Sequence, residues 1–294
     1  MTYSEIWHRI ATSYDDGEAR AIARILIEEL FGLSYADIVC GATEQLSADD
    51  TLRLDTAVRR IEQGEPLQHV LGYADFCGNR FSVNGSVLIP RPETEWLVDE
   101  GAKLMDGCIA SDETQHKAPH SPKRILDIGT GSGCIAISLK LRLGDAYVEA
   151  WDISEEALRT AQDNADALKA EVVFRKRDAL RADNTAAPWD LIVSNPPYIC
   201  DSERSAMDDN VLLHEPHTAL FVPDDDPLRF YRAIARYTLL TLNIGGSLLF
   251  ECNTRYAEAT GTMLRDMGFE EVTVSDDCFS LPRFVRGRKN SHNQ

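Results

Sequence analysis

A short apolar run is joined to a helical segment by the sequence Leu126-Asp127-Ile128-Gly129-Thr130-Gly131-Ser132-Gly133. Residues 124–128 are predicted to form a strand, and residues 133–142 a helix. Glycines permit a tight turn and let the backbone approach a ligand where a Cβ atom would clash. The helix that follows presents unpaired N–H groups to an anionic end of that ligand. The pattern therefore predicts a strand, a ligand-binding turn and a helix in succession.

The spacing of the glycines and the next acidic residue at a strand end, Asp152, narrow the kinds of ligand that fit this turn. G-x-G-x-G is shorter than the G-x-G-x-x-G pyrophosphate pattern and lacks the Lys-Ser/Thr of a P-loop, so a carboxylate-bearing ligand is as compatible as a phosphate. Asp152 ends the next predicted strand, roughly 20 residues on, where an acid accepts hydrogen bonds from a ribose diol. Taken alone, Asp152 would also suit a helix cap. Together the two features indicate a nucleoside-containing cofactor.

Strands and helices alternate along the chain from residue 124 onward. After residue 128 the apolar runs predict strands at 147–151, 172–174, 191–193, 247–250, 272–274 and 283–285. Helical periodicity lies between them, at 155–168, 231–242 and 256–267. Such alternation implies right-handed crossovers and a mostly parallel sheet covered by helices on both faces, which is an α/β fold.

The N-terminal part has a different pattern. Residues 4–65 are periodic like helices, with a stripe at Ile22, Ile25, Leu26 and Leu30, and Ser47 with Asp50 resembles a capping box. We expect a small helical domain at residues 1–75 that recognises the substrate. A hairpin around Gly78-Asn79 and Asn84-Gly85 is expected at 76–92, followed by a catalytic domain at 93–294. That domain is expected to begin with a helix at 93–105 and a loop at 107–123.

The chemistry is indicated by Ser194-Asn195-Pro196-Pro197-Tyr198, at the end of an apolar strand. The prolines fix φ and hold the preceding residues extended. The Asn195 side-chain oxygen and the carbonyl before Pro197 are acceptors for both hydrogens of a flat NH₂ group, and Tyr198 adds an aromatic face. Such a nitrogen is a poor nucleophile because its lone pair is delocalised. Accepting its hydrogens while the nitrogen pyramidalises selectively favours the transition state.

The composition of the chain disfavours several classes of protein. The 294 residues carry a formal charge of −18, with 48 acidic and 30 basic side chains, which disfavours a protein that grips long stretches of phosphate backbone. No apolar run approaches the ~20 residues of a membrane helix, and residues 1–10 do not resemble a signal peptide. The seven cysteines are scattered without a CxxC pair, as in a reduced cytoplasmic protein. We find no metal-binding or Ser-His-Asp pattern, and we expect no metal.

The glycine loop, Asp152 and residues 194–198 resemble class I S-adenosylmethionine-dependent methyltransferases that act on exocyclic or amide nitrogens. Further stretches are similar to the bacterial peptide chain release factor N5-glutamine methyltransferases. These are QHVLG at 68–72, LIPRPETE at 88–95, residues 125–137, and EPHTAL at 215–220. The likeness runs with interruptions from residue 68 to residue 288.

This resemblance implies a Rossmann-like, mostly parallel seven-stranded sheet and S-adenosyl-L-methionine as cofactor. It implies a cofactor site made of Gly129, Thr130, Gly131, Ser132, Gly133, Asp152, Asp178, Ala179 and Asn195. Substrate binding falls to Asn195, Pro196, Pro197 and Tyr198, of which Asn195, Pro196 and Tyr198 are the expected catalytic residues. The segment 90–92 resembles a cover over the pocket.

The implied reaction is methylation of the glutamine in the Gly-Gly-Gln loop of release factors, a cytoplasmic step of translation termination. The expected partners are release factors, with no membrane and no direct nucleic-acid substrate. Methylation of a ribosomal-protein glutamine and N6-adenine methylation stay open as alternatives, although the latter would require base flipping and phosphate binding, against the acidic balance. A non-catalytic nucleoside-binding module is disfavoured by the intact residues 194–198.

Two departures from the family pattern stand out. The family commonly shows E-x-G-x-x-Q where this chain has Glu251-Cys252-Asn253-Thr254-Arg255-Tyr256, and Ser280 stands where a glycine is common. We expect neither departure to touch the glycine loop or residues 194–198.

Overall fold

The computed structural model describes residues 1–110, 122–182 and 188–290, and the chain divides into two compact units. The helical unit consists of residues 1–73, 83–85 and 207–215. The sheet unit consists of residues 74–82, 86–206 and 216–294. The helical unit thus includes residues 207–215, which lie far along the sequence and follow residues 194–198 closely.

The helical unit contains α1 (Tyr3–Ile10), α2 (Asp16–Phe31), α3 (Tyr35–Val39), α4 (Ala48–Glu62), α5 (Leu67–Leu71) and α9 (Asp209–His214). Side-chain caps set the helix starts, because Asp15 accepts from Gly17 and Glu18 N–H and Ser47 accepts from Asp50 N–H. On α2, Ile22 and Leu26 are buried as the stripe predicts, whereas Ile25 and Leu30 are only partly buried. Ala23 and Ile27 complete the buried face instead.

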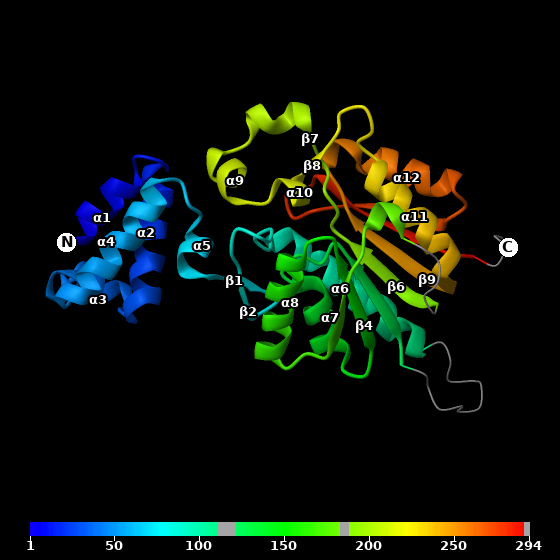
Figure 1. The fold of residues 1–294 in the computed structure, drawn as a ribbon, viewed down its shortest axis with the longest axis horizontal. Coiled ribbons are helices and arrows are strands. Elements are labelled where there is room, and N and C mark those ends of the chain that lie inside the picture. The colour runs from blue at the N-terminus through cyan, green and yellow to red at the C-terminus, as the bar shows by residue number, and fades with distance from the viewer. Residues whose placement is uncertain (111–121, 183–187, 291–294) are drawn as a thin grey trace. The chain divides into compact units, whose positions relative to one another are not determined.

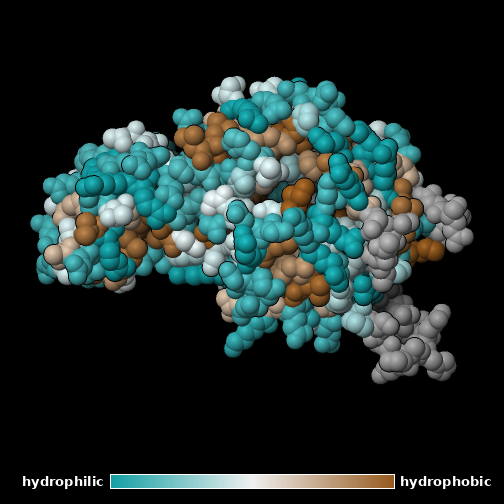
Figure 2. Space-filling model, in the orientation of Figure 1, coloured by the Kyte–Doolittle hydropathy of each residue, from teal (hydrophilic) through white to brown (hydrophobic). Residues whose placement is uncertain are grey.

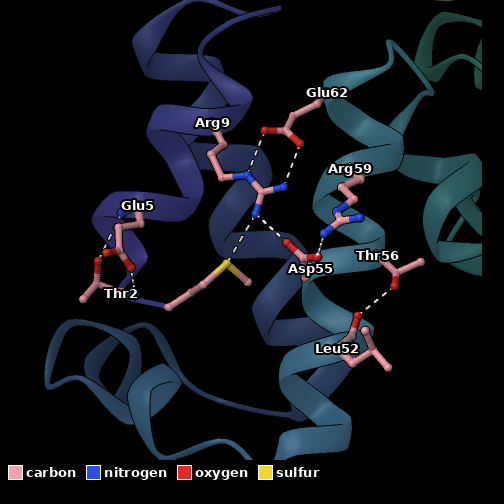
Figure 3. A network of polar contacts seen from close by, with 9 residues as sticks. Thr2, Glu5, Arg9, Leu52, Asp55, Thr56, Arg59 and Glu62 are labelled. Atoms are coloured by element: carbon pink, nitrogen blue, oxygen red, sulfur yellow. Dashed lines mark hydrogen bonds and ion pairs between the residues drawn. The ribbon is translucent and has the colours of Figure 1, made fainter.

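An ion-pair network ties α1 to α4 (Figure 3). The Arg9 guanidinium donates to both carboxylate oxygens of Glu62, at 2.8 and 2.7 Å, and to Asp55 Oδ1 at 2.7 Å. Arg59 pairs with the other oxygen of Asp55 at 2.7 Å. Planar guanidinium suits such bidentate contact, so Arg9 fixes the relative placement of these two helices.

A two-stranded hairpin follows α5. It is formed by β1 (Tyr73–Phe76) and β2 (Asn79–Ser82), and its turn residues Cys77 and Gly78 both have positive φ, at 48° and 73°. Positive φ at both central positions matches the right-handed twist of the flanking strands. Residues 83–92, including Asn84-Gly85, form no strand.

Figure 1 shows the sheet of the sheet unit. Its strand order is β10–β11–β9–β6–β3–β4–β5. Its strands are β3 (Arg124–Ile128), β4 (Tyr147–Asp152), β5 (Val172–Lys176), β6 (Trp189–Ser194), β9 (Leu242–Glu251), β10 (Glu270–Asp276) and β11 (Pro282–Arg288). Among the described strands of this sheet, β11 alone runs opposite to the rest, and it pairs antiparallel with both β9 and β10, while all other neighbours pair in parallel. The predicted mostly parallel, seven-stranded α/β sheet is therefore confirmed.

Helices cover both faces of this sheet. One core joins Ile125, Val148 and Leu191 to helices α6 (Glu95–Ala110), α7 (Cys134–Leu143) and α8 (Glu155–Leu168). The other joins Leu126 and Ile192 to α11 (Arg229–Thr241) and α12 (Ala257–Asp266). Since alternate residues of a strand face opposite ways, one continuous apolar strand supplies both cores.

Some boundaries differ from the predictions. Helix α6 continues to Ala110, beyond the predicted start of a loop at 107, and the rest of that predicted loop up to 121 lies outside the described residues. Short elements after β6 were not predicted: β7 (Ile199–Cys200), α10 (His217–Leu220) and β8 (Phe221–Val222). Such short pieces carry too little periodicity to be detected in the sequence.

The surface on the face seen in Figure 2 is mostly hydrophilic, with apolar residues in separate small groups. Within the described ranges, no helix has the length and apolar character needed to cross a membrane. Free thiols are carried by Cys40, Cys77, Cys134, Cys200, Cys252 and Cys278.

Candidate functional site

The carboxyl ends of three neighbouring parallel strands bring the predicted site residues together. Ile128 of β3 pairs with Trp151 of β4 and with Ser194 of β6. The residues that follow these strands therefore emerge side by side at one edge, where open α/β sheets bind ligands. A cavity of about 350 Å³ lies there. Its lining includes Gly129, Gly131, Asp152, Asp178, Ala179, Asn195, Pro196 and Pro197.

The three loop glycines have different surroundings. All three have positive φ, and a Cβ at Gly131 would meet nothing within 4 Å. A Cβ at Gly133 would lie 2.8 Å from Ile137 Cδ1 and 3.1 Å from Ala161 Cβ. Gly129 and Gly131 thus border the cavity, whereas Gly133 lets α7 pack closely against α8.

The other two loop residues predicted for the cofactor are buried behind the loop. The Thr130 hydroxyl donates to Asp127 Oδ2 at 2.6 Å, and the Ser132 carbonyl accepts from Asn164 Nδ2 at 2.9 Å. Neither side chain lines the cavity. Complete burial raises the pKa of Asp127 to about 7, although the Thr130 hydroxyl favours its charged form.

Asp152 is held facing the cavity by backbone donors. Its Oδ2 accepts from Gly131 N–H and its Oδ1 from Ser154 N–H, both at 2.9 Å. Burial raises the pKa of this carboxyl, while these N–H groups favour the charged form. Ser154, and not Asp152, caps α8. A carboxylate oxygen accepts more than one hydrogen bond, so Asp152 retains capacity for the two hydroxyls of a ribose.

The cavity lining also includes the predicted pair Asp178 and Ala179, together with residues that the sequence did not single out. Asp178 caps a short 3₁₀ turn, Ala179–Arg181, with Oδ1 accepting from Leu180 N–H at 2.9 Å. Beyond that predicted pair, the lining also includes Ser86, Val87, Leu88, Ile153, Arg177, Arg229, Phe230 and Ile234. Arg229 and Phe230 open α11, about 75 residues after Asp152, and no short motif links such distant positions.

Residues 194–198 divide between the cavity and the structure behind it. Ser194 is buried, and its hydroxyl donates to the Ile128 carbonyl at 2.6 Å, which joins β6 to β3. Asn195, Pro196 and Pro197 line the cavity. Tyr198 is not among the lining residues; its hydroxyl donates to Glu251 Oε1 at 3.3 Å, and its N–H donates to the Leu220 carbonyl at 3.2 Å.

Glu251, the last residue of β9, is a buried acid behind the cavity. It is 1% exposed and accepts from the Thr94 hydroxyl at 2.7 Å as well as from Tyr198. Burial raises the pKa of Glu251, and the Thr94 hydroxyl and the charge of Arg283 oppose that rise. Neither Thr94 nor Glu251 was a predicted site residue, because a functional role for them depends on contacts 157 positions apart in sequence.

The expectation that the departures leave residues 194–198 untouched is wrong for Asn253. Its Nδ2 donates to the Tyr198 carbonyl at 3.3 Å and to Glu203 Oε2 at 3.1 Å. The hydroxyl of Tyr256 lies 3.4 Å from the Sγ atom of Cys200, which follows Tyr198 by two residues. Ser280 has a φ of 61°, a conformation that glycine adopts more easily than other residues.

The residues of this cavity suit S-adenosylmethionine. Asp152 contributes carboxylate oxygens, which are acceptors of the kind that ribose hydroxyls require, Gly131 leaves open space beside the backbone, and Val87, Leu88 and Ile153 supply apolar walls. Nowhere in the described parts of the chain do three or more His, Cys, Asp or Glu side chains gather in a way that would hold a metal ion.

Comparison with known proteins agrees with this geometry. Residues 96–220 match the family described as Methyltransferase small domain, and residues 8–72 match PrmC N-terminal domain. The fold is shared with the hMettl16 catalytic domain in complex with MAT2A 3′UTR hairpin 6, at 17% identity over 84% of each chain and a TM-score of 0.53. The fold and cavity are those of a class I methyltransferase with S-adenosylmethionine as the methyl donor.

Full-length relatives define the particular family. The release factor glutamine methyltransferase of Bacteroides thetaiotaomicron is 43% identical over 94% of this chain and 95% of its own length. That of Flavobacterium psychrophilum is 35% identical over 94% of both. The chain belongs to the release factor glutamine methyltransferase family.

Proposed function

We propose that this enzyme methylates the side-chain amide nitrogen, N5, of the glutamine in the Gly-Gly-Gln loop of peptide chain release factors. The observation that carries the proposal is that Asn195, Pro196 and Pro197 line the same cavity as Gly131 and Asp152. The residues proposed to hold the amide, Asn195 to Pro197 (the clamp), therefore share one cavity with residues proposed to bind the nucleoside, Gly131 and Asp152. Family membership and the names of the full-length relatives support the choice of acceptor.

The chemistry follows from placing an unreactive amide against an activated methyl group. S-adenosylmethionine supplies the methyl on a sulfonium; the S–CH₃ bond breaks as the N–CH₃ bond forms, and one amide proton leaves to solvent. Asn195 Oδ1 and the Pro196 carbonyl accept the two N–H hydrogens. They favour the pyramidal nitrogen of the transition state over the planar ground state. The residues of the chain contribute by orienting the amide and by favouring the charge distribution of the transition state.

The roles of the remaining residues follow the same division. Gly129, Gly131, Asp152, Asp178 and Ala179 bind the cofactor, with Asp152 on the ribose hydroxyls. Thr130, Ser132 and Gly133 support that loop from behind. Tyr198 does not line the cavity and is proposed to position the substrate amide through the preceding residues Asn195, Pro196 and Pro197.

Residues 1–75 are proposed to recognise the protein substrate. They contain 14 acidic and 6 basic side chains, which makes this part a poor surface for phosphate and a suitable one for a basic protein surface. A chain truncated before Phe76 is expected to lose most of its activity on the intact factor. Its cofactor affinity, measured by calorimetry, reports separately whether the sheet unit still folds.

The deciding experiment offers the enzyme and labelled cofactor three acceptors: an intact release factor, the same factor with its loop glutamine replaced, and adenine-containing DNA. We expect label only in the intact factor, on the glutamine identified by mass spectrometry. Label in the DNA, or undiminished label in the glutamine-replaced factor, would overturn the proposal. A ribosomal protein with an accessible glutamine, labelled in place of the release factor, would do the same.

A further inference from the structure

Three polar side chains form a continuous hydrogen-bonded chain behind the cavity. Asn195 Nδ2 lies 3.4 Å from Thr94 Oγ1, and Thr94 Oγ1 lies 2.7 Å from Glu251 Oε2. Thr94 ends the 3₁₀ turn Pro92–Thr94 ahead of α6, whereas Glu251 ends β9 and Asn195 follows β6. Thr94 and Glu251 are 3% and 1% exposed, so water does not substitute for either partner.

The direction of these hydrogen bonds is set by Glu251, the residue at the buried end of the chain of three. Glu251 Oε2 accepts from the Thr94 hydroxyl, and Glu251 Oε1 accepts from the Tyr198 hydroxyl. Because Thr94 spends its single hydrogen on Glu251, only its lone pairs face Asn195. Asn195 must then present its NH₂ group, and not its oxygen, to Thr94.

This direction matters because an asparagine side chain has two ends of nearly equal size. Shape alone does not decide which end of the amide enters the cavity; the hydrogen-bond partners decide it. The glutamine amide that is to be methylated brings two N–H donors. An Asn195 with its NH₂ group in the cavity would set donor against donor, and the clamp would be lost.

We propose that Thr94 and Glu251 are positioning residues that hold the Asn195 amide with its oxygen toward the reacting nitrogen. This inference rests on the proposed function, since it assigns the clamp's polarity to residues outside the cavity. Neither residue lines the cavity, so both act through Asn195 and neither is a contact of the cofactor.

The test compares Thr94→Val, which keeps the shape and removes the hydroxyl, with Thr94→Ser, which keeps the hydroxyl. We expect Thr94→Val to lower kcat on the release factor about tenfold, with the Kd of S-adenosylmethionine and the Tm close to wild type. Thr94→Ser is expected to restore most of that loss. The matched control is Thr241→Val on α11, which removes another buried hydroxyl, one that donates to the Tyr237 carbonyl, and should leave kcat unchanged.

A second measurement does not depend on catalysis. In ¹⁵N-asparagine-labelled enzyme, with the Asn195 signal assigned from Asn195→Asp, the side-chain NH₂ is expected to show an NOE to the Thr94 methyl group and slow exchange with water. Both should be lost in Glu251→Gln, which also serves if Thr94→Val does not fold. A wild-type kcat in Thr94→Val, equal losses in the Val and Ser variants, or an Asn195 NH₂ remote from Thr94 would overturn the inference. An enzyme that shows the NOE but does not label release factors would contradict the proposed function alone.

Discussion

The side chain of Asn253 holds the backbone of Tyr198: its Nδ2 lies 3.3 Å from the Tyr198 carbonyl and also contacts Glu203. In the family pattern this position is commonly a glycine, which has no side chain to make either bond. Residues 194–198 of this chain therefore have a brace supplied by the segment that follows β9. The contact connects one departure from the family pattern directly to residues 194–198.

The first prediction tests this brace. Asn253→Ala should lower kcat about 3- to 10-fold, because losing a hydrogen bond worth about 1 kcal/mol loosens the Tyr198 backbone. The control is Asn243→Ala, which removes a 2.9 Å hydrogen bond from Nδ2 to Asp190 near the amino ends of β9 and β6. It should cost comparable thermal stability and leave kcat unchanged. Equal kcat values for the two variants would contradict a role for Asn253 in the site.

Asp152 is predicted to set cofactor affinity. Asp152→Ala removes the acceptor for two ribose hydroxyls, and leaving them buried without a partner should cost about 1–3 kcal/mol of binding to S-adenosylmethionine and to its demethylated product. Isothermal titration calorimetry measures both affinities. Glu155→Ala, which removes an exposed acid three residues along the chain, is the control and should bind normally. Unchanged affinity in Asp152→Ala would refute the ribose assignment.

Asn195 is predicted to act on turnover. Asn195→Ala should keep cofactor binding and lose roughly 10²–10³ in kcat, as expected for one group that interacts with the transition state. Tyr198→Ala should also reduce turnover, whereas Tyr198→Phe, which keeps the ring and loses only the bond to Glu251, should have a smaller effect. Steady-state kinetics at saturating cofactor separates these cases. A variant Asn195→Ala that loses cofactor binding but keeps its saturated rate would disprove the clamp.

Arg9 is predicted to stabilise the helical unit in a pH-dependent way. Arg9→Met should cost about 1 kcal/mol, since the bidentate pair with Glu62 is only partly shielded from water. The Arg9 hydrogen bonds lower the pKa of Glu62 from its ordinary 4.5. Their contribution is therefore complete above pH 4.5 and disappears as the pH falls through the lowered value.

Hydrogen exchange of the α1 and α4 amides reads this stability locally in the full chain. Wild type should lose protection as the pH falls below 4.5, and Arg9→Met should show less of that loss. Arg53→Met, which breaks a more exposed pair with Asp50 at 3.1 Å, should differ little from wild type at any pH. Indistinguishable protection in Arg9→Met and wild type at neutral pH would contradict the prediction.

Much of the fold followed from the sequence alone. The alternation of apolar runs and helical periods after residue 124 predicts the parallel sheet, because each strand must bury both faces and each helix one stripe. The positions of Asp152 and Asn195 at the ends of their strands likewise predict that both lie at the carboxyl end of the sheet, where they line one cavity. Helix ends set by Ser47 and Asp15 are local features, readable from a few neighbouring residues.

Only the tertiary structure shows which residues outside the cavity make hydrogen bonds to Asn195 and Tyr198, directly or through a neighbour. Thr94 and Glu251 are 157 positions apart, and Asn253 reaches Tyr198 across 55, so no local pattern announces either contact. The same holds for the loop, where the spacing of glycines does not distinguish Gly131, open to the cavity, from Gly133, packed against Ala161. Periodicity and turn chemistry act over a few residues and specify elements, whereas the partners of a buried polar side chain are set by how those elements pack.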